Sequence, residues 1–355
     1  MTVPAQYRQP WIRNRAFDSL FILLPPFLAL AIVAFLPNEF KTTNAMPLAG
    51  WVFLILFVDV AHVYSTLYNT YLDKERMRNH RVLFLVAPLV CFVCGYVLYS
   101  FGAVAFWRAL AYLAVFHFIR QQYGFLRIYA ASENTPLWKK RIDEVFIYSA
   151  TIYPILHWHL TASRNFNWFT DADFVFFKNT ALLQSLFALY IFTCCAYAIT
   201  EVYVWLKLRH INIPRNLILA GTAISWYAGI VVYNGDLAFT LLNTVSHGLP
   251  YMALIWAGMQ RNAERKSNST SGLNQLPKVW YGVGIFLSSL VLLAFIEEGL
   301  WDGLVWREHL QVFGLFSALP AIGNEKELAI LVPLLSLPQS THYVLDGFIW
   351  KKKFK

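Results

Sequence analysis

The chain has 355 residues and a formal net charge of +9, yet only 14% of its residues are charged and 58% are hydrophobic. A soluble domain carries roughly 25% charged residues, so this composition excludes an ordinary water-soluble globular protein. The positive charge does not indicate nucleic-acid binding, because the lysines and arginines lie in short connections between apolar runs, where charge sets membrane orientation. We therefore expect no nucleic-acid partner.

Apolar runs of about twenty residues recur along the whole chain, which is the length a helix needs to cross the hydrocarbon core of a bilayer. Backbone groups cannot remain unpaired in lipid, so such runs indicate helices. The sequence predicts an all-α, polytopic transmembrane helical bundle that forms a single integral membrane domain over residues 1–355. About ten spans are expected, near 17–37, 48–72, 82–102, 106–130, 143–162, 179–206, 216–234, 237–259, 279–297 and 327–350.

Two places along this series depart from a simple span. Pro25 and Pro26 lie inside the first span and are expected to kink it, because proline removes a helix hydrogen bond and crowds the preceding turn. The stretch 300–322 follows the ninth span and mixes apolar with charged residues. It is interpreted as an interfacial or re-entrant segment, which leaves the number of spans at ten.

Connections rich in basic residues alternate with acidic or nearly neutral connections along the series of spans. Basic groups precede the first span at Arg8, Arg13 and Arg15, and they recur at 73–81, 138–141, 207–210, 260–266 and in the closing KKKFK. The intervening connections are acidic or nearly neutral. By the positive-inside rule both the N- and C-termini are cytoplasmic, and the expected location is the bacterial inner membrane, or the endoplasmic reticulum in a eukaryote.

Four histidines fall within predicted spans, where ionisable residues are expensive and commonly mark function. His62, His117, His247 and His342 lie in the second, fourth, eighth and tenth spans. Counted from the cytoplasmic ends they are roughly 8–13 residues deep, or about 12–20 Å at 1.5 Å per residue. A single intramembrane histidine is often a hydrogen-bonded packing residue, but this shared depth favours one cluster built from four helices.

Carboxylates at helical spacing strengthen the metal-site interpretation. Asp59 precedes His62 by three residues and Asp346 follows His342 by four, so each pair shares a helix face. A histidine and a carboxylate one turn apart can ligate one ion together, or the carboxylate can orient the ring. The predicted ligands are therefore the four histidines with Asp59 and Asp346, and such a set suits iron best, with zinc or manganese as alternatives.

Arg120 and Gln121 accompany His117 in the fourth span and are the predicted catalytic residues. Gln121 lies one turn from His117, on the same face. Arg120 is expected to grip the polar or anionic end of a substrate, or else to form a salt bridge with Asp59, Asp346 or Glu201.

The general plan is similar to that of integral-membrane iron enzymes. The histidine boxes HxxxH and HxxHH of the fatty-acid desaturases and hydroxylases are absent, which argues against that family. Scattered intramembrane histidines in a multi-span chain resemble the plan of the Brp/Blh-type carotene dioxygenases, but no motif matches and no residue role is transferred.

These observations lead to a membrane metalloenzyme that oxidises a lipid or another hydrophobic substrate, by hydroxylation, desaturation or cleavage, with an electron donor as a possible partner. Membrane lipids are the expected surroundings. The alternative is a transporter of protons, metal ions or a small solute that uses the same histidines and aspartates as a relay. A b-type haem protein with paired axial histidines and a non-catalytic membrane partner also remain open.

Overall fold

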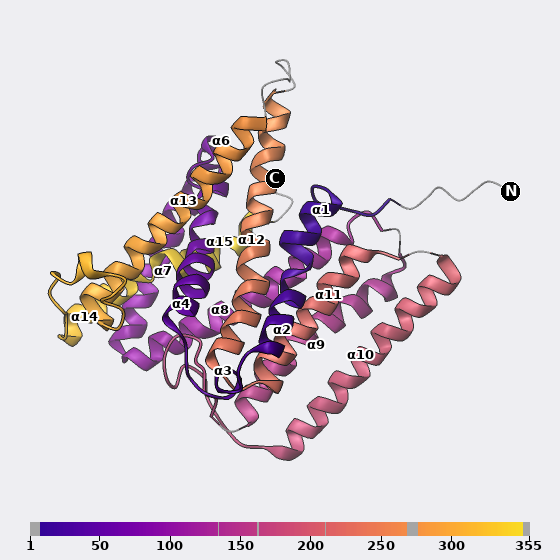
Figure 1. The fold of residues 1–355 in the computed structure, drawn as a ribbon, viewed down its shortest axis with the longest axis horizontal. Helices are drawn as coiled ribbons and strands as arrows, with labels where there is room; N and C mark the ends of the chain where they lie inside the picture. Colours follow the sequence, from indigo (N-terminus) through magenta and orange to yellow (C-terminus); the bar gives the residue numbers. More distant parts are fainter. Residues whose placement is uncertain (1–7, 134, 162, 210, 268–275, 351–355) are drawn as a thin grey trace. The chain divides into compact units, whose positions relative to one another are not determined.

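The computed structural model of the chain describes residues 8–133, 135–161, 163–209, 211–267 and 276–350. Within these residues all regular structure is helical and no β-strand occurs (Figure 1). The prediction of an all-α fold is therefore confirmed. The basic tail at 351–355, which contributed to the predicted orientation, lies outside the described residues.

The first half of the chain forms helices separated by short breaks. In chain order they are α1 (Arg15–Asp18), η1 (Ser19–Leu23), α2 (Pro25–Phe35), α3 (Glu39–Thr42), α4 (Leu48–Trp51), η2 (Val52–Val60), α5 (Ala61–Ser65), η3 (Thr66–Asn69), α6 (Lys74–Asn79), α7 (Arg81–Ser100), α8 (Ala103–Tyr129) and α9 (Leu137–Leu160). The segments η1 and η2 are π-helical, which means wider turns than an α-helix, and η3 is a tighter 3₁₀ turn.

The second half contains the longest helices. They are α10 (Thr180–Leu208), α11 (Ile213–Trp226), η4 (Tyr227–Val232), α12 (Asp236–Ser267), α13 (Leu276–Trp301), η5 (Asp302–Trp306), η6 (Gly314–Phe316), α14 (Glu325–Leu335) and α15 (Leu337–Ile349). Each of the ten segments predicted as spans is helical over most of its length.

Six helical segments among the described residues are long and apolar enough to cross a membrane. They are Leu48–Asn69, Arg81–Ser100, Ala103–Tyr129, Thr180–Lys207, Ile213–Val232 and Gly282–Trp306. Two bent pairs, 15–35 and 325–349, raise the number to eight if each pair forms one span. These segments indicate a multi-pass membrane protein, but they do not confirm the predicted ten spans or the cytoplasmic termini.

The bend in the first pair confirms the predicted kink. The axis turns by 47° between the segment Arg15–Leu23 and the helix Pro25–Phe35. Pro25 and Pro26 open the second helix, where a proline is tolerated because the first turn has no intrahelical partner for its nitrogen. Sequence reasoning therefore placed the kink correctly.

Helices α9 and α12 cover the fifth and eighth predicted spans but are not among the six apolar segments. The first turns of α9 carry the charged residues Lys139 and Asp143. Helix α12 carries a row of buried polar side chains, including Asn243, Ser246 and His247. These polar groups lower the hydropathy of both helices below that of a simple lipid-facing span, as expected for helices that line a protein interior.

The ambiguous stretch 300–322 forms no continuous helix long enough to span a bilayer. Helix α13 continues through η5 to Trp306, after which the described backbone is irregular apart from the short turn η6. The buried Asp302 carboxylate accepts hydrogen bonds from the backbone amides of Glu308 and His309, at 2.8 and 2.7 Å. These bonds turn the chain sharply at the end of η5.

The chain divides into two compact units, and the first comprises residues up to 46, 118–167 and 174–250. In this unit α9 packs against both α10 and α11, and α11 packs against α2 (Figure 1). Three stacked tyrosines join the helices: Tyr153 of α9 stacks on Tyr190 of α10 at 4.7 Å, and Tyr190 stacks on Tyr227 of η4 at 5.6 Å. Offset aromatic stacking of this kind adds to the burial free energy.

The second unit comprises residues 47–117, 168–173 and 251–355. Helix α7 packs against α14 and α15, while α13 packs against η2 and α5. The contact of α7 with α14 depends on Gly95, because a Cβ atom there would lie 3.0 Å from the Cβ of Pro333 and 3.2 Å from Cε2 of Phe106. Small residues allow helices to approach closely in membranes, where no hydrophobic force drives them together.

The start of α12 provides a prediction about pH. Burial raises the pKa of Asp236 from 3.8 to about 6, although a hydrogen bond from Thr240 partly opposes the shift. The folded state therefore binds this proton more tightly than the unfolded state, and its stability falls as pH rises from about 4 to about 6. We expect Asp236→Asn to be more stable than the natural chain at pH 7 by about 2 kcal/mol, and equally stable at pH 4. Thermal unfolding in detergent measures the difference.

The matched control for this prediction is Asp171→Asn, which neutralises an exposed carboxylate. Its effect on stability at pH 7 should be smaller than that of Asp236→Asn, because burial does not desolvate an exposed side chain. A similar pH response in both variants would contradict the assignment of the effect to Asp236.

Candidate functional site

The predicted histidines come together. His62, His117, His247 and His342 are all buried, and one ligand atom from each lies within 4.8 Å of the others. Two ligands on opposite sides of an ion with bonds of about 2.1 Å stand about 4.2 Å apart. The observed spread is close to that value, so these rings can hold a metal ion after small side-chain movements. Sequence depth alone predicted this cluster.

Three of the rings belong to the second unit and lie in contact with one another. The His342 ring on α15 is 5.1 Å from the His62 ring on α5 and 4.5 Å from the His117 ring on α8, measured between centroids, with interplanar angles of 80° and 64°. Each of these three residues is at most 3% exposed. One ligand atom from each of these rings belongs to the group whose members lie within 4.8 Å of one another.

Asp346 connects two of these histidines. Its Oδ2 lies 3.7 Å from Nδ1 of His117, and its Oδ1 lies 3.9 Å from Nδ1 of His342. The Asp346 side chain is only 7% exposed, and its Oδ1 also accepts a hydrogen bond of 2.5 Å from the hydroxyl of Tyr251. The carboxylate is therefore oriented toward the histidines, as outer-shell carboxylates are at protein metal sites.

Thr66 fixes the orientation of His342. Its hydroxyl lies 2.6 Å from Nδ1 of His342 and 2.9 Å from the hydroxyl of Tyr251. The other ring nitrogen of His342, Nε2, is buried and has no hydrogen-bond partner within the described residues. A histidine held at one nitrogen and unsatisfied at the other is arranged as a metal ligand is, because a buried nitrogen without a partner otherwise carries a desolvation penalty.

His62 and Asp59 share one helix face, as predicted. The Oδ1 atom of Asp59 lies 3.8 Å from Nδ1 of His62, and that nitrogen is also 3.2 Å from the carbonyl oxygen of Val58. The Asp59 side chain is 33% exposed, against 2% for His62. Asp59 lies in the π-helical segment η2, and such wide turns often occur at functional sites because they redirect side chains.

His247 is the fourth member of the group and lies on α12. Its ring stacks on Phe118 with a centroid distance of 3.5 Å and an interplanar angle of 6°. Its backbone carbonyl accepts a hydrogen bond of 2.9 Å from the side-chain amide of Gln121. The ring and the backbone at this position are thus both held in place.

Arg120 does not form the predicted salt bridge. It is exposed, donates a hydrogen bond of 2.6 Å to the Tyr148 hydroxyl and lies 4.8 Å above the Tyr123 ring. It forms no ion pair with Asp59, Asp346 or Glu201 in the part of the chain that the structure describes. The salt-bridge alternative is wrong, because the spacing of residues indicates the depth of an arginine and not the direction in which its long side chain extends.

Thr66 and Tyr251 are the site residues that sequence reasoning missed. Thr66 follows His62 by four residues, and Tyr251 follows His247 by four, so each stands one helical turn beyond a predicted ligand. The same spacing argument that identified Asp59 and Asp346 applies to them. They were overlooked because neutral hydroxyl groups are common in membrane helices.

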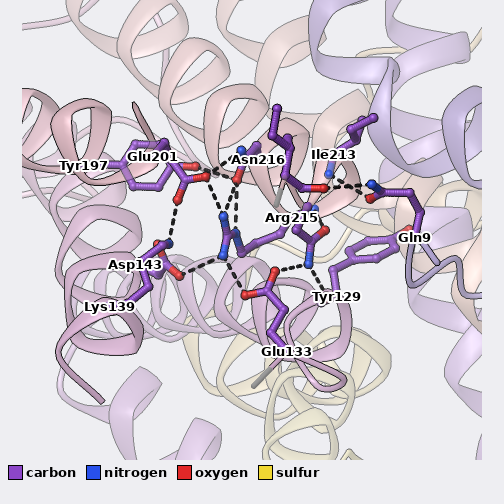
Figure 2. Close-up of polar contacts among 12 residues, drawn as sticks. Gln9, Tyr129, Glu133, Lys139, Asp143, Tyr197, Glu201, Ile213, Arg215 and Asn216 are labelled. Atoms are coloured by element: carbon purple, nitrogen blue, oxygen red, sulfur yellow. Dashed lines mark hydrogen bonds and ion pairs between the residues drawn. The ribbon is translucent and has the colours of Figure 1, made fainter. Parts of the chain in front are cut away.

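A second buried polar cluster lies in the first unit, around Arg215 (Figure 2). Arg215 is completely buried, and its guanidinium group forms ion pairs with Glu133 at 2.7 Å and Glu201 at 2.6 Å. Lys139, also completely buried, pairs with Glu201 at 2.6 Å and with Asp143. Glu201 therefore pairs with Lys139 and Arg215, and the expected pairing with Arg120 is wrong.

This ionic cluster ties three helices to the N-terminal segment. Arg215 lies in the first turn of α11, Lys139 and Asp143 lie in α9, and Glu201 lies in α10. The side chain of Gln9 extends the network, because it accepts a hydrogen bond from the backbone amide of Ile213 at 2.9 Å (Figure 2). Lys139 belongs to the basic connection 138–141 that contributes to the predicted orientation, yet its side chain is part of the protein interior.

The chain matches no protein-family model, no curated protein and no solved structure. Its chemistry must therefore be inferred from its own residues.

Proposed function

We propose that the protein is an integral membrane metalloenzyme, an iron-dependent oxygenase, hydroxylase or desaturase that acts on a lipid or another hydrophobic substrate. The observation that supports this proposal best is the group of four buried histidines whose ligand atoms lie within 4.8 Å of one another. The buried Nε2 atom of His342 has no hydrogen-bond partner among the described residues, and a bound metal ion would satisfy it. Iron is the preferred ion, with zinc or manganese as alternatives and haem as a less favoured one.

Each residue of the site has a proposed role. The four histidines ligate the ion, while Asp59 and Asp346 act as ligands or as carboxylates that orient the rings. Bound iron would supply activation of dioxygen. In a hydroxylation one oxygen atom would enter a C–H bond of the substrate and the other would leave as water, with two electrons and two protons supplied by an external donor. The burial of the four histidines would exclude bulk water from the reacting groups.

Arg120 and Gln121 are proposed to position the polar end of the substrate. Arg120 is exposed, and its guanidinium group lies above the Tyr123 ring, so it can grip an anionic group. Gln121 has a buried side-chain oxygen without a hydrogen-bond partner among the described residues. That oxygen is an available acceptor for a substrate hydroxyl or amide.

The test is the metal content and the optical spectrum of the natural chain purified in detergent. We expect about one iron per chain by elemental analysis and no Soret band, because imidazole and carboxylate ligands suit non-haem iron. A Soret band would establish the haem alternative instead. If the protein contains no transition metal as purified and binds neither Fe²⁺, Zn²⁺ nor Mn²⁺ on titration, the proposal is wrong.

The bent helix pairs favour one alternative, a transporter that uses the same histidines and aspartates as a relay or transit site. Transporters commonly place their sites at broken helices, and the pairs 15–35 and 325–349 bend by 47° and 45°. Reconstitution into proteoliposomes distinguishes the two functions. A transporter would move protons or a metal ion across the bilayer without a chemical change, whereas the enzyme would convert its substrate with no net flux.

We also propose ten spans with both ends in the cytoplasm, in the bacterial inner membrane or the endoplasmic reticulum. All ten predicted segments are helical, and basic connections alternate with acidic ones along the chain. Single cysteines introduced at Asp171 and Lys74 test this arrangement. A membrane-impermeant thiol reagent added from outside should label the first and not the second.

A further inference from the structure

An apolar cavity of about 210 Å³ lies in the second unit, next to the histidine centre. Its wall is formed by the helical run through α5 and η3, by α7 and by α15. The lining includes Leu67, Pro88, Leu337 and Leu345, and His342 and Thr66 also border it. One ring of the proposed metal site is thus part of the wall of this cavity.

The cavity exists because two prolines and a bend prevent close packing of the helices. Pro88 lies inside α7, and Pro338 is at the start of α15. The axis bends by 45° between α14 and α15, at Ser336. At one end of the cavity the same helices do pack closely. There Phe84 and Ala87 of α7 pack against the wall residue Leu345 and against Ile349 of α15. The space is therefore a local feature of otherwise well-packed helices.

The chemistry of the wall selects an apolar occupant. Thr66 already uses its hydroxyl on His342 and Tyr251, so the remaining surface is mostly aliphatic or aromatic, with Thr341 as a further polar lining residue. An apolar cavity of about 150 Å³ is known to stay dry and to bind benzene. The present cavity is larger, and its largely apolar lining offers few polar partners to a water molecule or an ion. Hydrocarbon fits it.

The position of the cavity indicates where that hydrocarbon comes from. Leu67, Pro88 and Leu337 are each partly exposed, so the wall reaches the surface of the unit. Beside Pro88, α7 presents apolar side chains outward, with Leu89 62% and Val90 51% exposed. Since α7 meets the criteria for a membrane span, this surface faces acyl chains.

We infer that the cavity holds a section of the hydrocarbon chain of a lipid and presents it to the side of the histidine centre formed by His342. Any reaction of this chain at that centre depends on the proposed function, but binding of the chain does not. The inference narrows the substrate class from any hydrophobic molecule to a lipid with a hydrocarbon chain. The reacting carbon would lie along the chain and not at the polar end.

The probe for this inference is a fatty acid with a photoreactive diazirine in the middle of its chain. Illumination of the purified full-length protein and mass spectrometry of its peptides should place the label on residues of the cavity wall, with Leu67 and Leu345 foremost. Unlabelled palmitate should compete for the labelling. Label spread evenly over exposed helix faces such as that of Leu89 would overturn the inference.

Two variants make the test specific. Leu67→Trp fills the cavity and should reduce labelling of its wall by at least about tenfold, since overpacking excludes the ligand. Leu89→Trp adds the same bulk on the outer face of α7 and should leave labelling unchanged. If Leu67→Trp fails to fold, Leu337→Phe replaces it as the filling variant, and wall labelling in the natural chain remains decisive on its own.

Metal content separates this inference from the proposed function. Both Leu67→Trp and Leu89→Trp should retain the metal content of the natural chain, because neither residue is a proposed ligand. Specific wall labelling in a protein that binds no metal would support the cavity as a lipid site and defeat the proposed enzyme. Normal metal content with no specific labelling would defeat the cavity and leave the metal site standing.

Discussion

Replacement of His342 with alanine is expected to reduce the metal affinity of the purified protein by more than about a hundredfold, since loss of an outer-shell partner alone typically costs 10–100-fold. The His342 ring contacts both the His62 and His117 rings. Its Nε2 atom is buried and has no hydrogen-bond partner among the described residues. Removing the ring takes away one ligand and leaves the other histidines to satisfy the ion alone. Metal content after dialysis against a competing chelator measures the loss.

The control is His80→Ala, which removes a histidine at the boundary between α6 and α7 that is not part of the group. Its metal content should equal that of the natural chain. Circular dichroism of both variants shows whether the helices persist. Full metal occupancy in His342→Ala, with the fold intact, would show that the four rings are packing residues and not a metal site.

Thr66→Val refines this prediction, because valine retains the shape of the side chain and removes its hydroxyl. The Thr66 hydroxyl is 2.6 Å from Nδ1 of His342, so its loss frees the ring to rotate. We expect metal affinity to fall by about 10–100-fold, which is less than for the loss of the ring itself. A positioning role predicts this ranking, and an unchanged affinity would assign Thr66 to packing alone.

Sequence reasoning succeeded where the information is local. The long apolar runs predicted the helices because lipid offers the backbone no hydrogen-bond partners, and Pro25 and Pro26 predicted the bend. The relations of His62 to Asp59 and of His342 to Asp346 also follow from helical spacing. In the structure Nδ1 of each of these histidines lies within 4 Å of Oδ1 of its aspartate.

Apart from the histidine cluster, contacts between distant segments could not be predicted in this way. Thr66 and His342 are 276 positions apart, and their contact depends on how α5 and α15 pack. Arg120 and Arg215 illustrate the same limit. Arg120 lies inside the predicted span 106–130 and Arg215 lies just before the span 216–234, yet Arg215 is completely buried in an ion-pair cluster and Arg120 is exposed. The number and spacing of charged residues indicate where the membrane–water interface lies, but not which charged side chains are buried in the folded protein.

Replacement of Arg215 with alanine is expected to destabilise the protein by about 3–5 kcal/mol, the usual cost of removing one partner from a buried ion pair. Arg215 is paired with Glu133 and Glu201, and Asp143 lies 3.6 Å from the guanidinium group. Without the arginine these carboxylates remain buried with only the ammonium group of Lys139 to balance them. The midpoint of thermal unfolding in detergent should fall accordingly, and α10 and α11 should loosen first.

An exposed arginine provides the matched control. Arg141 forms an ion pair of 2.9 Å with Glu144, but its side chain is 80% exposed. Water screens such a pair, so Arg141→Ala should change the stability by no more than about 1 kcal/mol. Adding Glu133→Gln to Arg215→Ala removes one uncompensated charge and should recover part of the loss, because residues in one network are energetically coupled. Equal unfolding midpoints for the two arginine variants would contradict the view that burial gives the ion pairs of this cluster their strength.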